Sequence, residues 1–196
     1  MRALIWMTTG IEPRQWAAVH RKHHKFSDAE GDPHVPYVHG IGQIQLLNYS
    51  YCRRETANPD TVARFTRDVA DDGWHRLFSR TWLGMVLFAG FFVAAFGPLL
   101  GAIALAAHML LYLFQNSSIN GAAHWIGYQR FANSARNIWL LALLTAGEGL
   151  HNNHHEFPGS SRFAQRWWEI DPGWYTIAIL RRLGLAQPAP SVAIGD

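Results

Sequence analysis

Residues 81–129 read TWLGMVLFAGFFVAAFGPLLGAIALAAHMLLYLFQNSSINGAAHWIGYQ and contain no Asp, Glu, Lys or Arg. A membrane span needs roughly 20 apolar residues, with about 17 as the lower limit, so the apolar run of about residues 82–115 is too long for one span and suits two short ones. The run is interrupted at Gly97 and Pro98, a helix-breaking pair. We therefore predict a transmembrane helical hairpin that turns there. A hairpin buried in a soluble bundle is the alternative, but a soluble helix usually keeps a polar face.

The composition of the whole chain also favours a membrane protein. Charged residues make up 16% of the 196 residues, and soluble domains carry about 25%. Nine tryptophans are present, a residue enriched at membrane interfaces. The one cysteine, Cys52, excludes a disulfide scaffold and a cysteine-only zinc site. The net charge is +3 with the bases scattered, so no nucleic-acid partner is expected.

Arginines flank the apolar run on both sides, and this sets the expected topology. Both ends of a hairpin emerge on one side of the membrane, and the positive-inside tendency makes that side cytoplasmic. The flanking residues are Arg64, Arg67, Arg76, Arg80, Arg130 and Arg136. No signal sequence is expected in residues 1–10. The chain is predicted to be a single all-α domain, 1–196, with a loop over residues 28–42. Helices are expected to start at Pro13 and Asp171, and a third is expected to start at Asn58 and run to Val69.

Histidines occur in two triplets with identical spacing, within HRKHH at residues 20–24 and HNNHH at residues 151–155. Positions i, i+3 and i+4 share one face of a helix, so each triplet offers three imidazoles to one point. Imidazole is a good ligand for iron, zinc, copper and nickel. One triplet could be a solvated patch. Two identical triplets more than a hundred residues apart favour a metal site.

Asn120 and His124 are four residues apart just beyond the apolar run, and on a continuing helix they share one face. His124 then becomes a seventh imidazole. Seven exceed what one metal uses, so two metals are predicted, and nitrogen ligation suits iron or zinc. A zinc hydrolase using Glu148 or Glu156 stays open, although both could instead accept from imidazole N–H groups. Asp28, Asp32 and Asp171 are further candidates for that supporting role or for helix capping.

Several of these motifs together resemble the integral-membrane fatty acyl desaturases of the stearoyl-CoA desaturase type. The matching stretches are HRKHHKFSD at 20–28, GDPH at 31–34, NGAAH at 120–124 and GEGLHNNHHEFP at 147–158. The ending, EIDPGWY at 169–175 and LGLA at 183–186, is similar to bacterial members. The resemblance runs from about residue 16 to the end of the chain. It implies a four-span helical bundle in the membrane with a histidine-rich helical cap on the cytosolic side.

The resemblance also implies a reaction and its partners. Two iron ions and O₂ would introduce a cis double bond into a fatty acyl-CoA or acyl-lipid chain in the membrane lipid. Electrons would come from a cytochrome b5-, ferredoxin- or rubredoxin-like protein. No catalytic residue separate from the metal ligands is expected. The implied metal ligands are His20, His23, His24, His124, His151, His154 and His155, with Asn120 holding a metal-bound water.

One departure from the family concerns its earlier histidine box, HxxxxH, which precedes the first triplet. No histidine stands before His20, and the HxxxxH spacing of His34 and His39 falls in a later loop and is interpreted as coincidental. The chain thus resembles the C-terminal two-thirds of a desaturase, and it is expected to be incomplete and inactive alone. The alternatives are a lipid, sterol or carotenoid hydroxylase of the same superfamily and an inactive membrane fragment.

Three further residues are candidates for substrate binding. Trp16 lies one helical turn before His20, where the family packs a tryptophan along the acyl tunnel; an interfacial anchor is the alternative. Arg53 and Arg54 could meet a coenzyme A or phospholipid phosphate, or form a solvated face near anionic lipid. His75 has no pattern partner, and His108, inside the apolar run, is expected to be structural with a hydrogen-bond partner.

Overall fold

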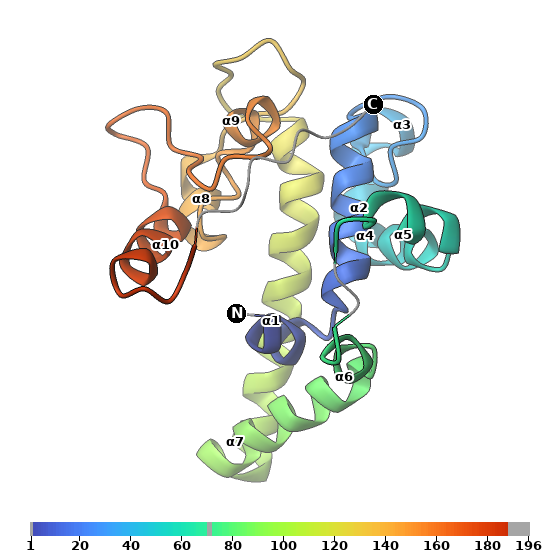
Figure 1. Ribbon diagram of the computed structural model, residues 1–196, viewed down its shortest axis with the longest axis vertical. Coiled ribbons are helices and arrows are strands. Elements are labelled where there is room, and N and C mark those ends of the chain that lie inside the picture. Colours follow the sequence, from blue (N-terminus) through green and yellow to red (C-terminus); the bar gives the residue numbers. More distant parts are fainter. Residues whose placement is uncertain (1, 70–71, 188–196) are drawn as a thin grey trace. The chain divides into compact units, whose positions relative to one another are not determined.

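The computed structural model describes residues 2–69 and 72–187, and these are mostly helical, as predicted (Figure 1). Within the described residues there is no strand, only the isolated bridges of Asn137 with Tyr128 and Leu150. The helical elements are α1 (Arg2–Thr9), α2 (Pro13–Phe26), α3 (Pro36–His39), α4 (Ile41–Thr56), α5 (Pro59–Phe65), α6 (His75–Phe78), α7 (Thr81–Asn120), the 3₁₀ turn η1 (Ala122–His124), α8 (Trp139–Leu144), α9 (His151–Glu156) and α10 (Pro172–Arg182).

Helix α7 is the one helix in the described part of the chain that is long and apolar enough to cross a membrane. It bends sharply at Gly97, whose φ of 77° and ψ of 170° are not helical (Figure 1). Pro98 follows and lacks the backbone N–H that a continuous helix would need there. The helical segments before and after the bend are in contact, because the ring centroids of Phe88 and His108 lie 4.9 Å apart. The most apolar stretch is only 6% buried.

The structure forms two compact units, and residues 2–22, 52–69 and 72–114 make up the first. In it α1 packs closely on α7, because a Cβ atom at Gly84 would lie 2.8 Å from the ring of Trp6. The ring of Trp6 also meets Phe78 edge-on at 5.5 Å. His108 has the partner that its apolar surroundings require, since its Nε2 lies 2.7 Å from the carbonyl of Thr8.

The second unit contains residues 23–51 and 115–187. Its apolar core is small and consists of Ala142, Leu150 and Ala164 with Phe163 against them. Much of the remaining interior is polar, with Asn137, Asn152 and Asn153 fully buried. Since buried polar groups are costly without hydrogen bonds, this unit depends on a bonded network more than on apolar packing.

Two expectations about helix limits need correction. Residues 28–42 are not all loop, because Pro36 begins the short helix α3 and α4 begins at Ile41. Proline favours the first turn of a helix, which explains the start of α3. The helix after Asn58 ends at Phe65, where residues to 69 were expected to continue it. The helices beginning at Pro13 and after Asp171 lie where they were predicted.

Candidate metal centre

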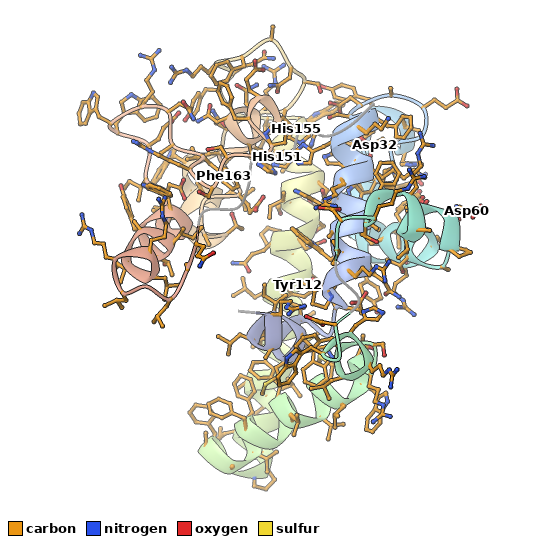
Figure 2. All side chains as sticks on the ribbon, viewed as in Figure 1. Asp32, Asp60, Tyr112, His151, His155 and Phe163 are labelled. Atoms are coloured by element: carbon orange, nitrogen blue, oxygen red, sulfur yellow. The ribbon has the colours of Figure 1, made fainter. Side chains whose placement is uncertain are left out.

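Four imidazoles of the second unit turn their Nε2 atoms toward one point. His23 comes from α2, His124 from η1, and His151 and His155 from consecutive turns of α9, where Figure 2 shows the last two side by side. The Nε2 atom of His155 lies 3.1 Å from those of His23 and His151, and the Nε2 atoms of His151 and His124 are 3.0 Å apart. All four ligand atoms lie within 4.8 Å of one another, which is close enough to share a metal ion.

Carboxylates lie behind two of these imidazoles and fix their orientation. Nδ1 of His23 lies 2.9 and 3.0 Å from the two carboxylate oxygens of Asp32, and Nδ1 of His124 lies 3.0 Å from Asp28. An ionised carboxylate only accepts, so each Nδ1 carries the proton and each Nε2 keeps its lone pair. Metal-binding histidines commonly have such a carboxylate on the far ring nitrogen. Asp28 and Asp32 therefore occupy the supporting position that the sequence left open.

Ser27 orients the ring of His155 in the way that the carboxylates orient His23 and His124. Ser27 Oγ donates to Asp28 at 3.3 Å and lies 3.1 Å from Nδ1 of His155. With its one proton used on Asp28, the hydroxyl accepts from Nδ1 of His155, so the Nε2 lone pair of His155 also faces inward. The lone pairs of His23 and His155 then oppose each other at 3.1 Å. That arrangement is repulsive unless a cation binds both, so the donor set fits a metal ion.

Burial favours the neutral form of two of these imidazoles, His23 and His155, and the neutral form is the one that binds metals. Desolvation, followed by the neighbouring imidazoles, lowers the pKa of His23 and His155 well below the ordinary value. Asp32 lies 2.9 Å from Nδ1 of His23, and the pKa of His23 is nevertheless lowered. Neutral imidazole is the ligand form, because a protonated ring nitrogen has no lone pair to donate.

A second pair of imidazoles lies beside the first four. Nε2 of His24 lies 2.9 Å from Nε2 of His154, and the ring of His24 is 4.4 Å from that of His155. Desolvation lowers the pKa of His24 to about 4 and that of His154 well below its usual value. The second unit thus brings together six of the seven predicted imidazoles. The seventh, His20, lies on α2 one turn before His24 and stacks on Trp16, with ring centroids 4.7 Å apart.

The expectation that Asn120 and His124 share one continuous helix is wrong. α7 ends at Asn120, and the chain enters the 3₁₀ turn through Gly121. Glycine is a poor helix former, and the tighter turn lets His124 reach Asp28. The side chain of Asn120 is buried and donates to the Asn116 carbonyl at 3.0 Å.

The two asparagines inside the second triplet were not singled out from the sequence. Asn152 accepts from the backbone N–H groups of Arg130 and Phe131 and donates to the carbonyls of Phe131 and Ala135 at 3.0 Å each. Asn152 therefore holds the loop of residues 130–135 against α9. Its partners are mostly backbone groups, which leave no mark in a sequence.

The neighbouring Asn153 ties α9 to the C-terminal part of the unit. It donates to the Phe163 carbonyl and to Glu169, each at 3.0 Å, and accepts from Asn137 at 2.9 Å. Glu169 also accepts from the Tyr128 hydroxyl at 2.7 Å. Burial opposes the charge of Glu169, but these hydrogen bonds outweigh it and lower its pKa. The buried carboxylate of Glu169 therefore links Asn153 of α9 to Tyr128.

The other acidic candidates have structural partners. Asp171 caps α10 by accepting from Trp174 N–H at 2.9 Å and also accepts from the N–H groups of residues 163 and 164. Desolvation and the charge of Asp171 raise the pKa of Glu148 to about 7. Glu156 accepts from the Asn133 amide at 3.3 Å.

The remaining candidate residues are the proposed substrate-binding residues and the two histidines with the HxxxxH spacing. Trp16 is 44% exposed, and Arg53 and Arg54 are exposed near the end of α4. His34 is buried, with its ring 5.0 Å from that of His23, while the ring of His39 lies against Tyr51. A ligand atom of His34 lies within 4.8 Å of those of His23 and Asp32, so His34 borders the site. That the spacing of His34 and His39 is coincidental stays a prediction. Substrate binding by Trp16, Arg53 and Arg54 stays a prediction.

Comparisons with known proteins agree on one family. The family model described as Fatty acid desaturase matches residues 1–178. The chain is 33% identical over 180 residues to an sn-1 stearoyl-lipid 9-desaturase of Synechocystis sp., covering 88% of this chain and 54% of that protein. It is 33% identical to an acyl-CoA 5-desaturase of Anemone leveillei over 89% of this chain and 55% of the relative. A Delta-9 acyl-lipid desaturase 1 of Arabidopsis thaliana is 29% identical, with 89% and 58% covered. The chain thus spans somewhat more than half the length of these relatives.

Proposed function

Because this chain belongs to the fatty acid desaturase family, we propose that it acts in a membrane-bound desaturase that introduces a cis double bond into an acyl-CoA or acyl-lipid chain. The observation that carries this proposal is the set of four convergent Nε2 atoms on His23, His124, His151 and His155, backed by Asp32 and Asp28. The relatives act on acyl lipids or acyl-CoA by their names, which supports a fatty acyl substrate.

The metal we propose is a pair of iron ions. Their ligands would be His20, His23, His24, His124, His151, His154 and His155, with Asn120 holding a bound water. When bound, the iron pair would supply the O₂ chemistry that removes two hydrogens from an unactivated methylene. The chain's own residues orient the ligands: Asp32 and Asp28 hold Nδ1–H of His23 and His124, and Ser27 holds His155. Burial of these rings keeps bulk water away from the reacting centre.

The membrane arrangement belongs to the same proposal. Residues of about 82–115 would form a transmembrane hairpin turned at Gly97, and the contact of Phe88 with His108 across the bend supports it. The histidine site would lie on the cytoplasmic side, where the flanking arginines favour it. Trp16 would border the acyl chain, and Arg53 and Arg54 would meet a substrate phosphate. A cytochrome b5-, ferredoxin- or rubredoxin-like carrier would deliver the electrons.

Fatty-acid profiling in a desaturase-deficient host tests the function. The gene is expressed with any reading frame that continues upstream of Met1, because the relatives are longer than this chain. New unsaturated acyl chains are expected, and His151→Ala should abolish them. His39→Ala, which removes an imidazole that stacks on Tyr51 outside the cluster, is the matched control and should keep the product. Hydroxylated product would favour the hydroxylase alternative.

A further inference from the structure

The C-terminal part of the second unit has an exposed surface of one charge sign. Residues 157–187 contain four basic residues, Arg162, Arg166, Arg181 and Arg182, and all four are exposed. The same residues contain two acids, Glu169 and Asp171, which are only 3% and 1% exposed. Both acids are used inside the unit, as described above. The solvent-facing side of this segment is therefore basic, with no exposed carboxylate to balance it.

Large apolar side chains lie among these arginines. Trp167 is 93% exposed, although tryptophan is usually well buried. Tyr175 and Ile179 on α10 and Leu183 at its C-cap follow one another at intervals of four residues and are 52%, 57% and 64% exposed. Four-residue spacing puts them on one helical stripe. An apolar stripe with arginines beside it and aromatics at its start is typical of helices that lie in a membrane interface.

Hydrogen bonds within the second unit link the start of α10 to the region of Gln115. Gln115 is the first polar residue after the apolar run, and its amide donates to the Leu144 carbonyl at the end of α8 at 2.9 Å. Gly173 N–H, in the first turn of α10, donates to the Ala146 carbonyl at 3.1 Å. Both bonds lie within the second unit. The beginning of α10 is therefore linked, through residues 144–146, to Gln115, where α7 becomes polar.

We propose that residues 162–185, here called the C-terminal surface, lie on the membrane and bind anionic phospholipid headgroups. The arginines would meet lipid phosphates while Trp167 and the stripe of α10 enter the headgroup region. The inference rests on the proposed membrane location of α7. Its occupant is lipid because the exposed charge is uniformly positive, as an anionic leaflet requires. A second copy of this chain would bring the same positive charge to the surface, which disfavours that occupant.

Site-directed fluorescence in vesicles tests this inference. The full chain carries Cys52→Ser and one new cysteine with an environment-sensitive dye, at Trp167 or Ile179. Val93 in the apolar run and Ala132 in an exposed loop give the lipid and water references. Vesicles are phosphatidylcholine alone or mixed with phosphatidylglycerol, and acrylamide is the quencher. In the anionic vesicles we expect quenching at 167 and 179 to be at least threefold weaker than at 132.

Removing arginine charges shows whether lipid binding or another contact protects the dye from the quencher. A basic residue near an anionic surface is worth about 1 kcal/mol, or roughly fivefold in the bound fraction. Arg181→Gln with Arg182→Gln should lower the anionic preference about 25-fold by that constant. Arg181→Lys with Arg182→Lys, which keeps both charges, is the matched control and should leave the preference unchanged.

Three outcomes would overturn the inference. Labels at 167 and 179 quenched like 132, while 93 stays protected, would reject the C-terminal surface and leave the hairpin intact. Quenching at 93 as strong as at 132 would reject the hairpin itself. Protection that is equal in both lipids and insensitive to the arginine pair would mean that protein covers this surface.

Discussion

Asp32 shows how a single carboxylate shapes the site. It accepts from Nδ1 of His23 and from the backbone N–H groups of Asp28 and His34, at 2.9 to 3.1 Å. It therefore orients one proposed ligand and also closes the turn that places Asp28 against His124. Neither role follows from sequence spacing, which only marked both aspartates as candidates.

At this site we predict that Asp32→Asn weakens iron binding 10- to 100-fold, because carboxylate partners of metal-binding histidines contribute on this scale. The amide oxygen can still accept from Nδ1, but the carboxylate charge is lost and the amide NH2 cannot accept from the backbone N–H group that the other carboxylate oxygen binds. Iron titration of the purified protein measures the affinity. Asp60→Asn, an exposed carboxylate in the first turn of α5 (Figure 2), is the matched control. Equal affinities for both variants would contradict the role given to Asp32.

Cys52 allows a prediction on pH. Burial raises the pKa of its thiol from 9.0 to about 12. At pH 8 the folded protein then holds about a thousandfold less thiolate than the unfolded chain, and only thiolate is alkylated efficiently. We expect iodoacetamide to modify Cys52 in denaturant and to leave the folded protein unmodified over the same time, as read by mass spectrometry. Because the folded pKa is the higher one, ionisation also favours unfolding progressively above pH 9. Equal alkylation rates would contradict this.

Helix α9 is the element on which the site depends most. It has six residues, too few to be stable in isolation. Its position is set by packing at Gly149 and by the bonds of Asn152 and Asn153. A Cβ atom at Gly149 would collide with the backbone of Ala142 and Leu141. Only glycine lets α8 and the start of α9 approach this closely.

We predict that Gly149→Ala destabilises the protein by about 1–3 kcal/mol, the usual range for overpacking, and lowers iron content because α9 shifts. Gly159→Ala is the matched control, since no atom lies within 4 Å of its Cβ position. Thermal unfolding followed by circular dichroism, with metal analysis on the same samples, compares the two. A Gly149→Ala protein as stable as the control would show that α8 and α9 can move apart without cost.

At the scale of helices and loops, the sequence predicts local structure well but predicts poorly the hydrogen bonds between residues distant in the chain. The i, i+3, i+4 spacing of the histidines predicts their helical faces, and Gly97–Pro98 predicts the bend in α7. The 3₁₀ turn before His124 was missed because a four-residue spacing fits a continuing helix equally well. The bonds of Asn152 and Asn153 were missed because their partners include carbonyls at residues 131, 135 and 163, which any residue type provides.

For the whole molecule the proposed hairpin makes a topological prediction. Residues before Arg80 and after Arg130 should lie on one side of the membrane. We place single cysteines at Ala57 and Ser161 in a Cys52→Ser background, both positions being exposed; Asn58 is avoided because its side chain caps α5. A membrane-impermeant maleimide should label both positions from the cytoplasmic side only. Labelling of the two from opposite sides would reject the hairpin.

The bonds of Asn152 and Asn153 have a consequence for how the second unit opens. They join α9 to the loop at 130–135 and to residues 163–169, and Ala164 of the latter shares one small apolar cluster with Leu150 just before α9. Breaking α9 therefore releases both loops together, so these three segments should behave as one cooperative foldon in hydrogen exchange. A ligand that binds only the folded foldon protects all of it by mass action. Amides at 163–169 should then exchange more slowly when metal binds, although none of those residues is among the proposed ligands.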